Sequence, residues 1–384
     1  MIETDTLIVG ASISGLASAS SLRKKGIEYI LIERESQLAM PWRNHYERLH
    51  LHTNKRLSNL PYKKFNGRIP RYPTRLQVLE YLDDYRAEFD INPVFNTEAK
   101  SINKEGAHWI TETSNGKYKS NHLIMATGPF SKPRSISFKG METFPGKIMH
   151  SYQYKTGRDF KDQKVLVVGF GNSACEIAID LYEQGASPSM SVRSPVNVIP
   201  RDLLGIPILE ISLWMSRLPP PIADAIAGPL MRLKFGDIRK LGLKKMPYGA
   251  FEEIIKDGNT PVLDIGTIGH IRKGHIKIYD NIDFIDGKAI HFSDGKIEEF
   301  DAIVAGIGYD RNYEDILHVD KSRFDDLRSP AGKQKYFGKD EVYFCGFWVG
   351  PRGQIREIGR DAKKIAQDIA NKEKSLNSNG KQNN

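Results

Sequence analysis

The sequence has little cysteine, no long apolar run and no leader-like N-terminus. Two cysteines, Cys175 and Cys345, occur in 384 residues, which excludes a disulfide framework, a thiolate zinc site and a C-x-x-C redox pair. No uncharged apolar run reaches the ~20 residues that a membrane-spanning helix needs. The first five residues lead directly into an apolar strand rather than a signal peptide. We therefore expect a soluble, cytoplasmic chain without a metal site or a transmembrane segment.

Acidic residues are fewer than basic ones, with 47 Asp and Glu against 56 Lys and Arg, so the formal net charge is +9. The basic residues are scattered along the chain, and no stripe or recognition motif for nucleic acid is present. The charge suits small anionic ligands, and we expect no nucleic-acid partner.

The N-terminal region carries the first of two similar strand–turn–helix motifs. A strand over 5–9 leads into Gly10, Ser12 and Gly15, and Glu33 ends the next strand. Glycines at such a turn let a pyrophosphate approach the helix N-terminus, and the carboxylate accepts ribose hydroxyls. Ser12 stands at the middle position, where its Cβ crowds the phosphate but its hydroxyl can donate a hydrogen bond. The motif predicts a dinucleotide site.

Residues 164–193 repeat this design with Gly169, Gly171 and Ala174 at the turn and Arg193 after the second strand. An arginine there pairs with a 2′-phosphate, whereas a carboxylate would repel it. The second site therefore favours NADP over NAD, although a solvated surface arginine is the plain alternative. Two dinucleotide sites in one chain indicate two cofactors, and the usual pairing is a nicotinamide donor with a flavin acceptor.

Residues 144–154 read F-x-G-x-x-x-H-x-x-x-Y and lie just before the second glycine turn. In motif, spacing and order this region resembles the flavin-containing monooxygenases. Further stretches resemble the plant YUCCA-type branch of that family, namely 48–61, 73–74, 90–96, 165–173 and 259–267. The likeness runs from about residue 5 to about residue 371, and we expect a bacterial relative of this branch.

The resemblance implies an α/β fold of two Rossmann-like domains, in which the NADP domain interrupts the FAD domain. We expect the FAD-binding domain at 1–154 and 299–372 and the NADPH-binding domain at 155–298. The latter contains an apolar insertion at 203–232, and 373–384 is expected to be a disordered tail. The insertion is interpreted either as a lid or substrate channel with weak membrane-surface contact, or as helices packed on the core or on the partner subunit of a homodimer.

YUCCA-type enzymes convert indole-3-pyruvate to indole-3-acetate with FAD, NADPH and oxygen. The resemblance therefore implies a flavin-dependent NADPH monooxygenase that acts through a C4a-(hydro)peroxyflavin on an aromatic 2-oxo acid. Two alternatives stay open: a promiscuous monooxygenase of sulfides, amines or ketones, and a non-catalytic flavin-binding redox sensor, which rests on Ser12 alone.

The resemblance also implies roles for single residues. His52 and Asn54 are the candidates beside the flavin, and His150 is expected to organise the linker between the cofactor sites. Further cofactor contacts are expected from Arg34, Trp42, Arg43, Thr127, Gly128, Asn172, Ser173, Arg201, Gly346, Arg352 and Gly353. Two departures from the family pattern stand out: Ala174 replaces a common glycine, and Gly306 begins G-I-G-Y where A-T-G-Y is usual.

Overall fold

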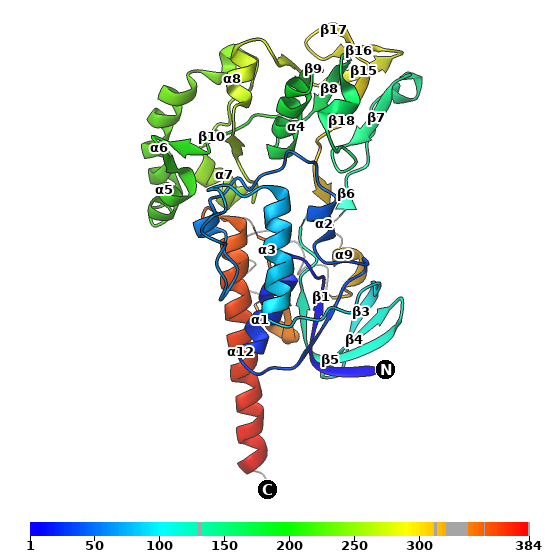
Figure 1. The fold of residues 1–384 in the computed structure, drawn as a ribbon, viewed down its shortest axis with the longest axis vertical. Helices are drawn as coiled ribbons and strands as arrows, with labels where there is room; N and C mark the ends of the chain where they lie inside the picture. Colours follow the sequence, from blue (N-terminus) through cyan, green and yellow to red (C-terminus); the bar gives the residue numbers. More distant parts are fainter. Residues whose placement is uncertain (130–131, 311–312, 320–336, 349, 383–384) are drawn as a thin grey trace. The chain divides into compact units, whose positions relative to one another are not determined.

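The computed structural model describes residues 1–129, 132–310, 313–319, 337–348 and 350–382 (Figure 1). Contacts divide the chain into two compact units. The first unit comprises Met1–Arg43, Thr53–Lys132 and Asp310–Asn384, and the second comprises Asn44–His52 and Pro133–Tyr309. The second unit thus interrupts the first in sequence, as the resemblance implies.

The first unit is built on a mixed sheet with strand order β2-β1-β5-β4-β3, and β20 also pairs with β5. The strands are β1 (Ile2–Val9), β2 (Tyr29–Ile32), β3 (Ala99–Glu105), β4 (His108–Thr113), β5 (Gly116–Met125) and β20 (Val342–Phe344). Its longer helices are α1 (Ile13–Arg23), α3 (Arg75–Glu88) and α12 (Gln354–Gln382). Strands β1, β2, β5 and β20 run parallel, so their carboxyl ends lie at one edge of the sheet.

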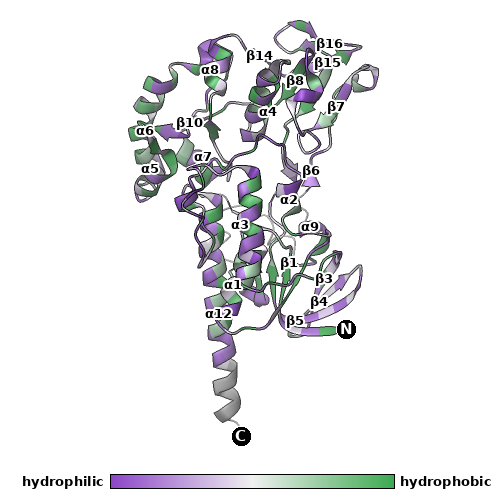
Figure 2. Ribbon diagram, viewed as in Figure 1, coloured by the Kyte–Doolittle hydropathy of each residue, from purple (hydrophilic) through white to green (hydrophobic). Residues whose placement is uncertain are grey.

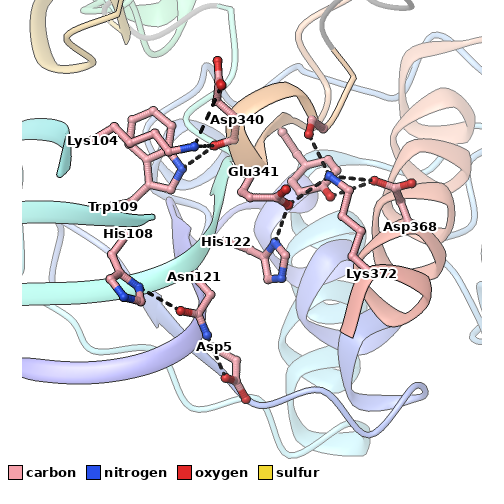
Figure 3. Close-up of polar contacts among 12 residues, drawn as sticks. Asp5, Lys104, His108, Trp109, Asn121, His122, Asp340, Glu341, Asp368 and Lys372 are labelled. Atoms are coloured by element: carbon pink, nitrogen blue, oxygen red, sulfur yellow. Dashed lines mark hydrogen bonds and ion pairs between the residues drawn. The ribbon is translucent and has the colours of Figure 1, made fainter. Parts of the chain in front are cut away.

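A polar cluster ties the C-terminal part of this unit to its N-terminal sheet (Figure 3). His122 on β5 lies 3.0 Å from the Glu341 carboxylate, and Lys372 on α12 lies 2.9 Å from the same group. Burial lowers the pKa of His122, and Glu341 opposes that shift. Trp109 also donates to the Asp340 carbonyl at 2.9 Å. Residues 340 and 341, just before β20, are thus fastened to strands more than 200 residues away in sequence, and Lys372 joins α12 to the same segment.

The second unit contains a five-stranded parallel sheet with strand order β14-β9-β8-β18-β7. The strands are β7 (Lys147–His150), β8 (Lys164–Val168), β9 (Ser187–Ser191), β14 (Lys277–Tyr279) and β18 (Ala302–Ala305). Helices α4 (Asn172–Glu183) and α8 (Thr267–Arg272) pack together beside it. An antiparallel sheet follows, formed by β15 (Ile282–Asp286), β16 (Ala289–Phe292) and β17 (Ile297–Glu299).

The remaining elements are short. They are α2 (Met40–Arg43), β6 (Lys132–Pro133), β10 (Val198–Pro200), α7 (Ala250–Lys256), β13 (Val262–Asp264), β19 (Tyr309–Asp310), α9 (Tyr313–Ile316) and the 3-10 helices η1 (Lys55–Leu57), η2 (Met141–Thr143), η3 (Gly157–Phe160), η4 (Ile238–Leu241) and η5 (Lys339–Glu341).

The predicted domain boundaries differ from the structure. Residues 44–52, 133–154 and 299–309, expected in the FAD-binding domain, group with the second unit, and β7 and β8 flank β18 in one parallel sheet. Of the disordered tail expected at 373–384, residues 373–382 continue helix α12, and 383–384 lie outside the described residues. Extending an existing helix avoids the cost of a new nucleus, so a polar sequence can follow a packed helix without a break.

The apolar insertion forms a hairpin and two helices in the second unit. These elements are β11 (Asp202–Leu203), β12 (Ile206–Pro207), α5 (Ile208–Met215) and α6 (Pro220–Phe235). Figure 2 shows apolar residues along both helices, and several of them are exposed rather than packed on the core. In the part of the chain that the structure describes, no helix is long and apolar enough to cross a membrane.

Candidate dinucleotide-binding sites

The first glycine turn joins β1 to α1 and is tightly packed. Gly10 has φ +104°, and a Cβ there would lie 3.0 Å from the Ala126 carbonyl oxygen. A Cβ on Gly15 would lie 2.0 Å from the Gly10 carbonyl oxygen, closer than any real contact. Both glycines are therefore needed for the turn itself, as the motif predicts.

Ser12 is the N-cap of α1, but its side chain makes no capping hydrogen bond. The helix N-terminus is thus not closed by its own cap residue, and such a terminus attracts an anion through its N–H groups and dipole. The serine hydroxyl is left available for a ligand, which agrees with the predicted compensation for the missing middle glycine.

Glu33 lies beside this turn at the end of β2. Its Oε2 accepts the Ala11 N–H at 2.7 Å, and its Oε1 accepts the Glu35 N–H at 3.1 Å. Each carboxylate oxygen can accept a second hydrogen bond, so the Glu33 carboxylate can still accept a hydrogen bond from a ribose hydroxyl. The neighbouring Arg34 is exposed and pairs with Glu35 at 3.2 Å.

The residues after β5 and β20 approach the same end of the sheet. Thr127 follows β5, and its buried Oγ1 has no hydrogen-bond partner among the described residues; Gly128 has φ +74°. Gly346 follows β20 with φ +81°, and a Cβ there would lie 2.3 Å from the Ser14 Oγ in the first turn of α1. The strand end and the helix start therefore approach closely only because residue 346 is glycine.

The start of α12 holds a group of unsatisfied polar atoms. Within the described ranges, four buried atoms here lack a hydrogen bond: Arg352 Nε, Gln354 Oε1, Arg356 Nε and Glu357 Oε1. Gln354 donates to the Gly346 carbonyl at 2.8 Å, and Gly353 has φ +88°. Arg352 Nε and Glu357 Oε1 pair with each other at 3.4 Å, whereas Gln354 Oε1 and Arg356 Nε have no hydrogen-bond partner among the described residues. Buried polar atoms without partners are costly, so these two atoms fit a polar ligand such as FAD.

Trp42 and Arg43, expected near the flavin, form part of α2. Arg43 donates to both carboxylate oxygens of Asp83 on α3, at 2.8 and 2.9 Å, and to the Leu38 carbonyl at 3.0 Å. Arg75 donates to the Arg43 carbonyl at 2.8 Å. The structure thus gives Arg43 a bracing role between two helices, and Trp42 is half-buried beside it.

Asn54, the second candidate beside the flavin, is buried and caps a short helix. Its Oδ1 accepts the Leu57 N–H at 3.2 Å at the start of η1. This contact assigns the side chain a structural task that the sequence motif does not reveal.

The second glycine turn joins β8 to α4. Gly169 has φ +109°, and a Cβ there would lie 2.5 Å from the Gly306 carbonyl oxygen. A Cβ on Gly306 would lie 2.8 Å from the Ala174 Cβ. Gly171 is the N-cap of α4 and has open space where a Cβ would stand. The protein itself therefore does not require glycine at 171, whereas a closely approaching phosphate would.

Asn172 and Ser173, expected at the pyrophosphate, face protein groups. Asn172 accepts the Leu263 N–H at 2.8 Å and donates to the Pro261 carbonyl at 3.5 Å. Ser173 shares a side-chain hydrogen bond with Tyr46. These side chains brace the turn against neighbouring loops.

The basic residues expected at the 2′-phosphate lie in different settings. Arg193 is exposed just beyond β9, and its carbonyl accepts Lys244 Nζ at 3.3 Å. Arg201 lies 3.4 Å from the Asp202 carboxylate and is one-third exposed. Lys244 pairs with Asp280 at 2.8 Å. The structure thus places Lys244, which the sequence motif does not indicate, beside Arg193.

His150 bridges two backbone segments of the second unit. Its Nδ1 accepts the Tyr152 N–H at 3.1 Å, and its Nε2 lies 3.0 Å from the Gly308 carbonyl oxygen, to which the Nε2–H tautomer donates. Burial lowers the pKa of His150, and the Gly308 carbonyl opposes that shift. A neutral imidazole with both nitrogens engaged is a positioning group rather than a general base.

The segment 44–52 is held against α4 by acidic residues that sequence reasoning missed. Glu176 is buried, accepts a hydrogen bond from the Tyr46 hydroxyl, and lies 3.3 Å from His52 Nε2. Burial, reinforced by the Glu176 charge, raises the pKa of Tyr46 well above its usual range. Arg48 donates to both oxygens of Glu183, each at 2.9 Å.

A signal for this contact exists in the sequence. Glu176, Asp180 and Glu183 recur at helical spacing on the otherwise apolar α4, and Asp180 accepts the Tyr154 hydroxyl at 2.6 Å. Acidic side chains on a buried helix face need hydrogen-bond or charged partners. The spacing in the sequence does not indicate which residues these partners are.

The two cysteines lie in different units, and both are buried. Burial raises the pKa of the Cys175 thiol, which keeps it protonated and unreactive.

Comparison with known proteins identifies the family. Indole-3-pyruvate monooxygenase YUCCA6 of Arabidopsis thaliana is 38% identical over 380 residues, which covers 96% of this chain and 90% of the relative. The chain belongs to the YUCCA family of flavin monooxygenases. Indole-3-pyruvate monooxygenase YUCCA4 of rice (Oryza sativa subsp. japonica) is 35% identical and covers 94% of this chain and 86% of its own. This membership confirms the monooxygenase class and the cofactors FAD and NADPH.

Two further comparisons agree on the fold of this YUCCA-family chain. The family described as "Pyridine nucleotide-disulphide oxidoreductase" matches residues 7–202. A flavin-containing monooxygenase from Stenotrophomonas maltophilia superposes with a TM-score of 0.70 at 18% identity, covering 96% of this chain and 98% of that one. Cyclohexanone monooxygenase superposes with a TM-score of 0.75 at 16% identity, covering 97% and 88%. The chain shares this two-domain fold, but it lacks the close cysteine pair that disulfide chemistry needs.

Proposed function

We propose that this chain catalyses the NADPH- and oxygen-dependent oxidative decarboxylation of an aromatic 2-oxo acid, with indole-3-pyruvate as the first substrate to test. The observation that carries the proposal is the 38% identity to indole-3-pyruvate monooxygenase YUCCA6 over nearly the full length of both chains. The reaction converts R–CO–COOH, O2, NADPH and H⁺ into R–COOH, CO2, NADP⁺ and H2O. Bound FAD would supply the redox chemistry by accepting hydride from NADPH and activating oxygen.

The first unit supplies groups that fit FAD. The α1 N-terminus with Gly10, Ser12 and Gly15 would hold the pyrophosphate, and Glu33 would accept ribose hydroxyls. Thr127 Oγ1, Gln354 Oε1 and Arg356 Nε are buried polar atoms that lack hydrogen-bond partners among the described residues. Hydrogen bonds from FAD would satisfy these atoms, so binding would also stabilise this end of the first unit.

The second unit supplies groups that fit NADPH. The open space at Gly171 suits a closely approaching phosphate, and Arg193 with Lys244 would face the 2′-phosphate. His150, with both ring nitrogens engaged, would fix the backbone between β7 and Gly308. Glu176 would orient His52 through the imidazole Nε2. In this scheme no protein side chain acts as a nucleophile.

The test is a coupled assay on the purified, FAD-loaded chain. We expect indole-3-acetate to form in a near one-to-one ratio with NADPH consumed, identified by chromatography and mass. Parallel reactions with phenylpyruvate, a thioether, a tertiary amine and a cyclic ketone examine the alternative substrates. NADPH oxidation that yields only hydrogen peroxide with indole-3-pyruvate, together with product from another substrate, would overturn the proposed substrate class.

A further inference from the structure

Helix α6 turns an apolar side away from the core. Its exposed large apolar residues recur every three or four positions and therefore share one side of the helix, namely Ile222, Ile226, Leu230 and Leu233. Leu233 is 85% exposed, whereas Phe235 on the opposite side of the helix is buried. In a surface helix packed on its own core the apolar side faces inward, so this outward side calls for a partner.

Two other elements of the insertion also expose large apolar residues. Leu204 lies at the tip of the β11–β12 hairpin, is 95% exposed and has φ +52°, a conformation that is uncommon for a residue other than glycine. Trp214 on α5 is 72% exposed, and the Arg217 guanidinium lies 4.9 Å from the centre of its ring. We call Leu204, Trp214, Ile222, Ile226, Leu230 and Leu233 the apolar face.

The charges around the apolar face are predominantly basic. Arg217, Arg232 and Lys234 are exposed, and the stretch 203–236 contains two acidic residues, Glu210 and Asp224. Asp224 is turned towards α7, because its two oxygens accept the N–H groups of residues 251 and 252 at 3.0 and 2.9 Å. The exposed rim therefore offers positive charge to whatever covers the apolar residues.

We propose that the apolar face docks on the surface of a lipid bilayer that contains anionic lipids. Apolar side chains would enter the boundary between headgroups and acyl chains, and the basic rim would meet the negative lipid headgroups. Tryptophan and arginine are favoured at that boundary. A symmetric contact with a second copy of the chain is disfavoured, because it would set the basic rim of one copy against that of the other.

The experiment is flotation of the purified, FAD-loaded full chain with two kinds of vesicle, phosphatidylcholine alone and phosphatidylcholine mixed with phosphatidylglycerol. We expect binding to the mixed vesicles that weakens as salt is raised. The double variant Ile226→Ser/Leu233→Ser should lower the partition coefficient about tenfold or more. Arg232→Glu/Lys234→Glu should remove the preference for the mixed vesicles.

A matched control keeps the result interpretable. Ile297 on β17 is 59% exposed in the same unit but outside the apolar face, so Ile297→Ser should bind vesicles as the unchanged chain does. All variants alter exposed side chains, and retained FAD absorbance with an unchanged melting temperature would show that they fold. If the unchanged chain binds neither kind of vesicle, the proposal is overturned. In that case, sedimentation that shows a dimer dissociated by Ile226→Ser/Leu233→Ser would assign the apolar face to a contact between two copies of the chain. Equal loss of binding in Ile297→Ser would also overturn the proposal.

Discussion

The two glycine turns share one local design and differ at the middle position, residue 12 in the first turn and residue 171 in the second. In the first turn, the protein's own backbone requires Gly10 and Gly15, since a Cβ on Gly15 would lie 2.0 Å from the Gly10 carbonyl oxygen. In the second turn, the backbone likewise requires Gly169, but Gly171 faces open space, so the protein's own packing does not account for glycine at 171. The equivalent position of the first turn is Ser12, so the two turns differ where we expect a pyrophosphate to approach.

The second turn also explains two departures from the family pattern. A Cβ on Gly306 would lie 2.8 Å from the Ala174 Cβ, so alanine at both positions would clash. The chain has alanine at 174 and glycine at 306, whereas the family commonly has the reverse pair. The two changes compensate each other, and the close approach of α4 to the end of β18 is kept.

The largest effect should follow from Gly15→Ala. The new methyl group would strike the Gly10 backbone, and overpacking against backbone costs about 3 kcal/mol. We expect loss of bound FAD after purification, read from the visible absorbance, together with a lower melting temperature. The matched variant Gly171→Ala should fold with full FAD content and weaken only NADPH binding. Equal behaviour of the two variants would break the contrast between the turns.

The compensation between residues 174 and 306 predicts a measurable coupling. Gly306→Ala alone should lower the free energy of unfolding by about 2 kcal/mol, and Gly306→Ala/Ala174→Gly should recover most of that loss. Gly269 in α8 has open space around it, so Gly269→Ala should be neutral or slightly stabilising. Thermal unfolding of the unchanged chain, Gly306→Ala, Ala174→Gly, the double variant and the Gly269→Ala control tests this, and additive effects of the two substitutions would contradict the compensation.

The helix of the second turn also holds segment 44–52, and Glu176→Gln tests that link. Glutamine keeps the shape of the Glu176 side chain but removes the negative charge that faces His52 and Tyr46. The free energy of unfolding should therefore fall by about 1.5 kcal/mol. The exposed pair of Arg48 and Glu183 contributes less, so Glu183→Gln should cost about 0.5 kcal/mol. A role for Glu176 in orienting His52 further predicts a changed pH profile of NADPH oxidation in Glu176→Gln only. If the pH profile of NADPH oxidation is unchanged in both variants, Glu176 has a structural role only and does not orient His52 for the reaction.

A smaller effect is expected from the basic residue of the second turn. Arg193→Ala should raise the KM for NADPH about tenfold and leave that for NADH nearly unchanged, because only NADPH carries the 2′-phosphate. Arg239→Ala, which removes an exposed charge that pairs with Asp237, should change neither constant. A parallel rise in both KM values for Arg193→Ala would show that Arg193 does not recognise the 2′-phosphate.

The smallest effect is the pH dependence that His150 contributes. Since the folded chain lowers the pKa of His150, the unfolded chain takes up the proton first, near pH ~6.5. The stabilisation is therefore complete above that pH and is lost as the pH falls below it. Melting temperatures between mildly alkaline and mildly acidic pH should fall less steeply for His150→Asn than for the unchanged chain. An identical slope would contradict the lowered pKa.

The sequence predicts the parts of this fold that are local. In each unit the predicted order of strand, glycine turn, helix and strand is found, as β1, α1 and β2 and as β8, α4 and β9. Gly10, Gly15 and Gly169 occupy positions where a side chain would meet backbone. A positive φ or a close approach of two backbone segments favours glycine, so such positions can be recognised in the sequence.

Contacts between distant segments could not be read in this way. The Gly306–Ala174 approach, the Glu176–His52 pair and the cluster around His122 join residues that only the folded chain brings together. The bracing roles of Arg43 and Asn54 were missed for the same reason, since a polar side chain fits a ligand or a protein partner equally well in sequence. Composition indicates that the insertion is apolar, whereas only the structure shows that one side of α6 faces outward.

We propose that this YUCCA-family chain inserts an oxygen atom from O2 into a 2-oxo acid. The most direct test is a reaction of the FAD-loaded chain with NADPH and indole-3-pyruvate under isotopically heavy oxygen gas, with catalase present to remove free hydrogen peroxide, which by itself decarboxylates 2-oxo acids. We expect indole-3-acetate with one heavy oxygen atom, formed only when NADPH is present. Indole-3-acetate without the heavy atom, or NADPH consumption without indole-3-acetate, would contradict the proposed oxygen insertion.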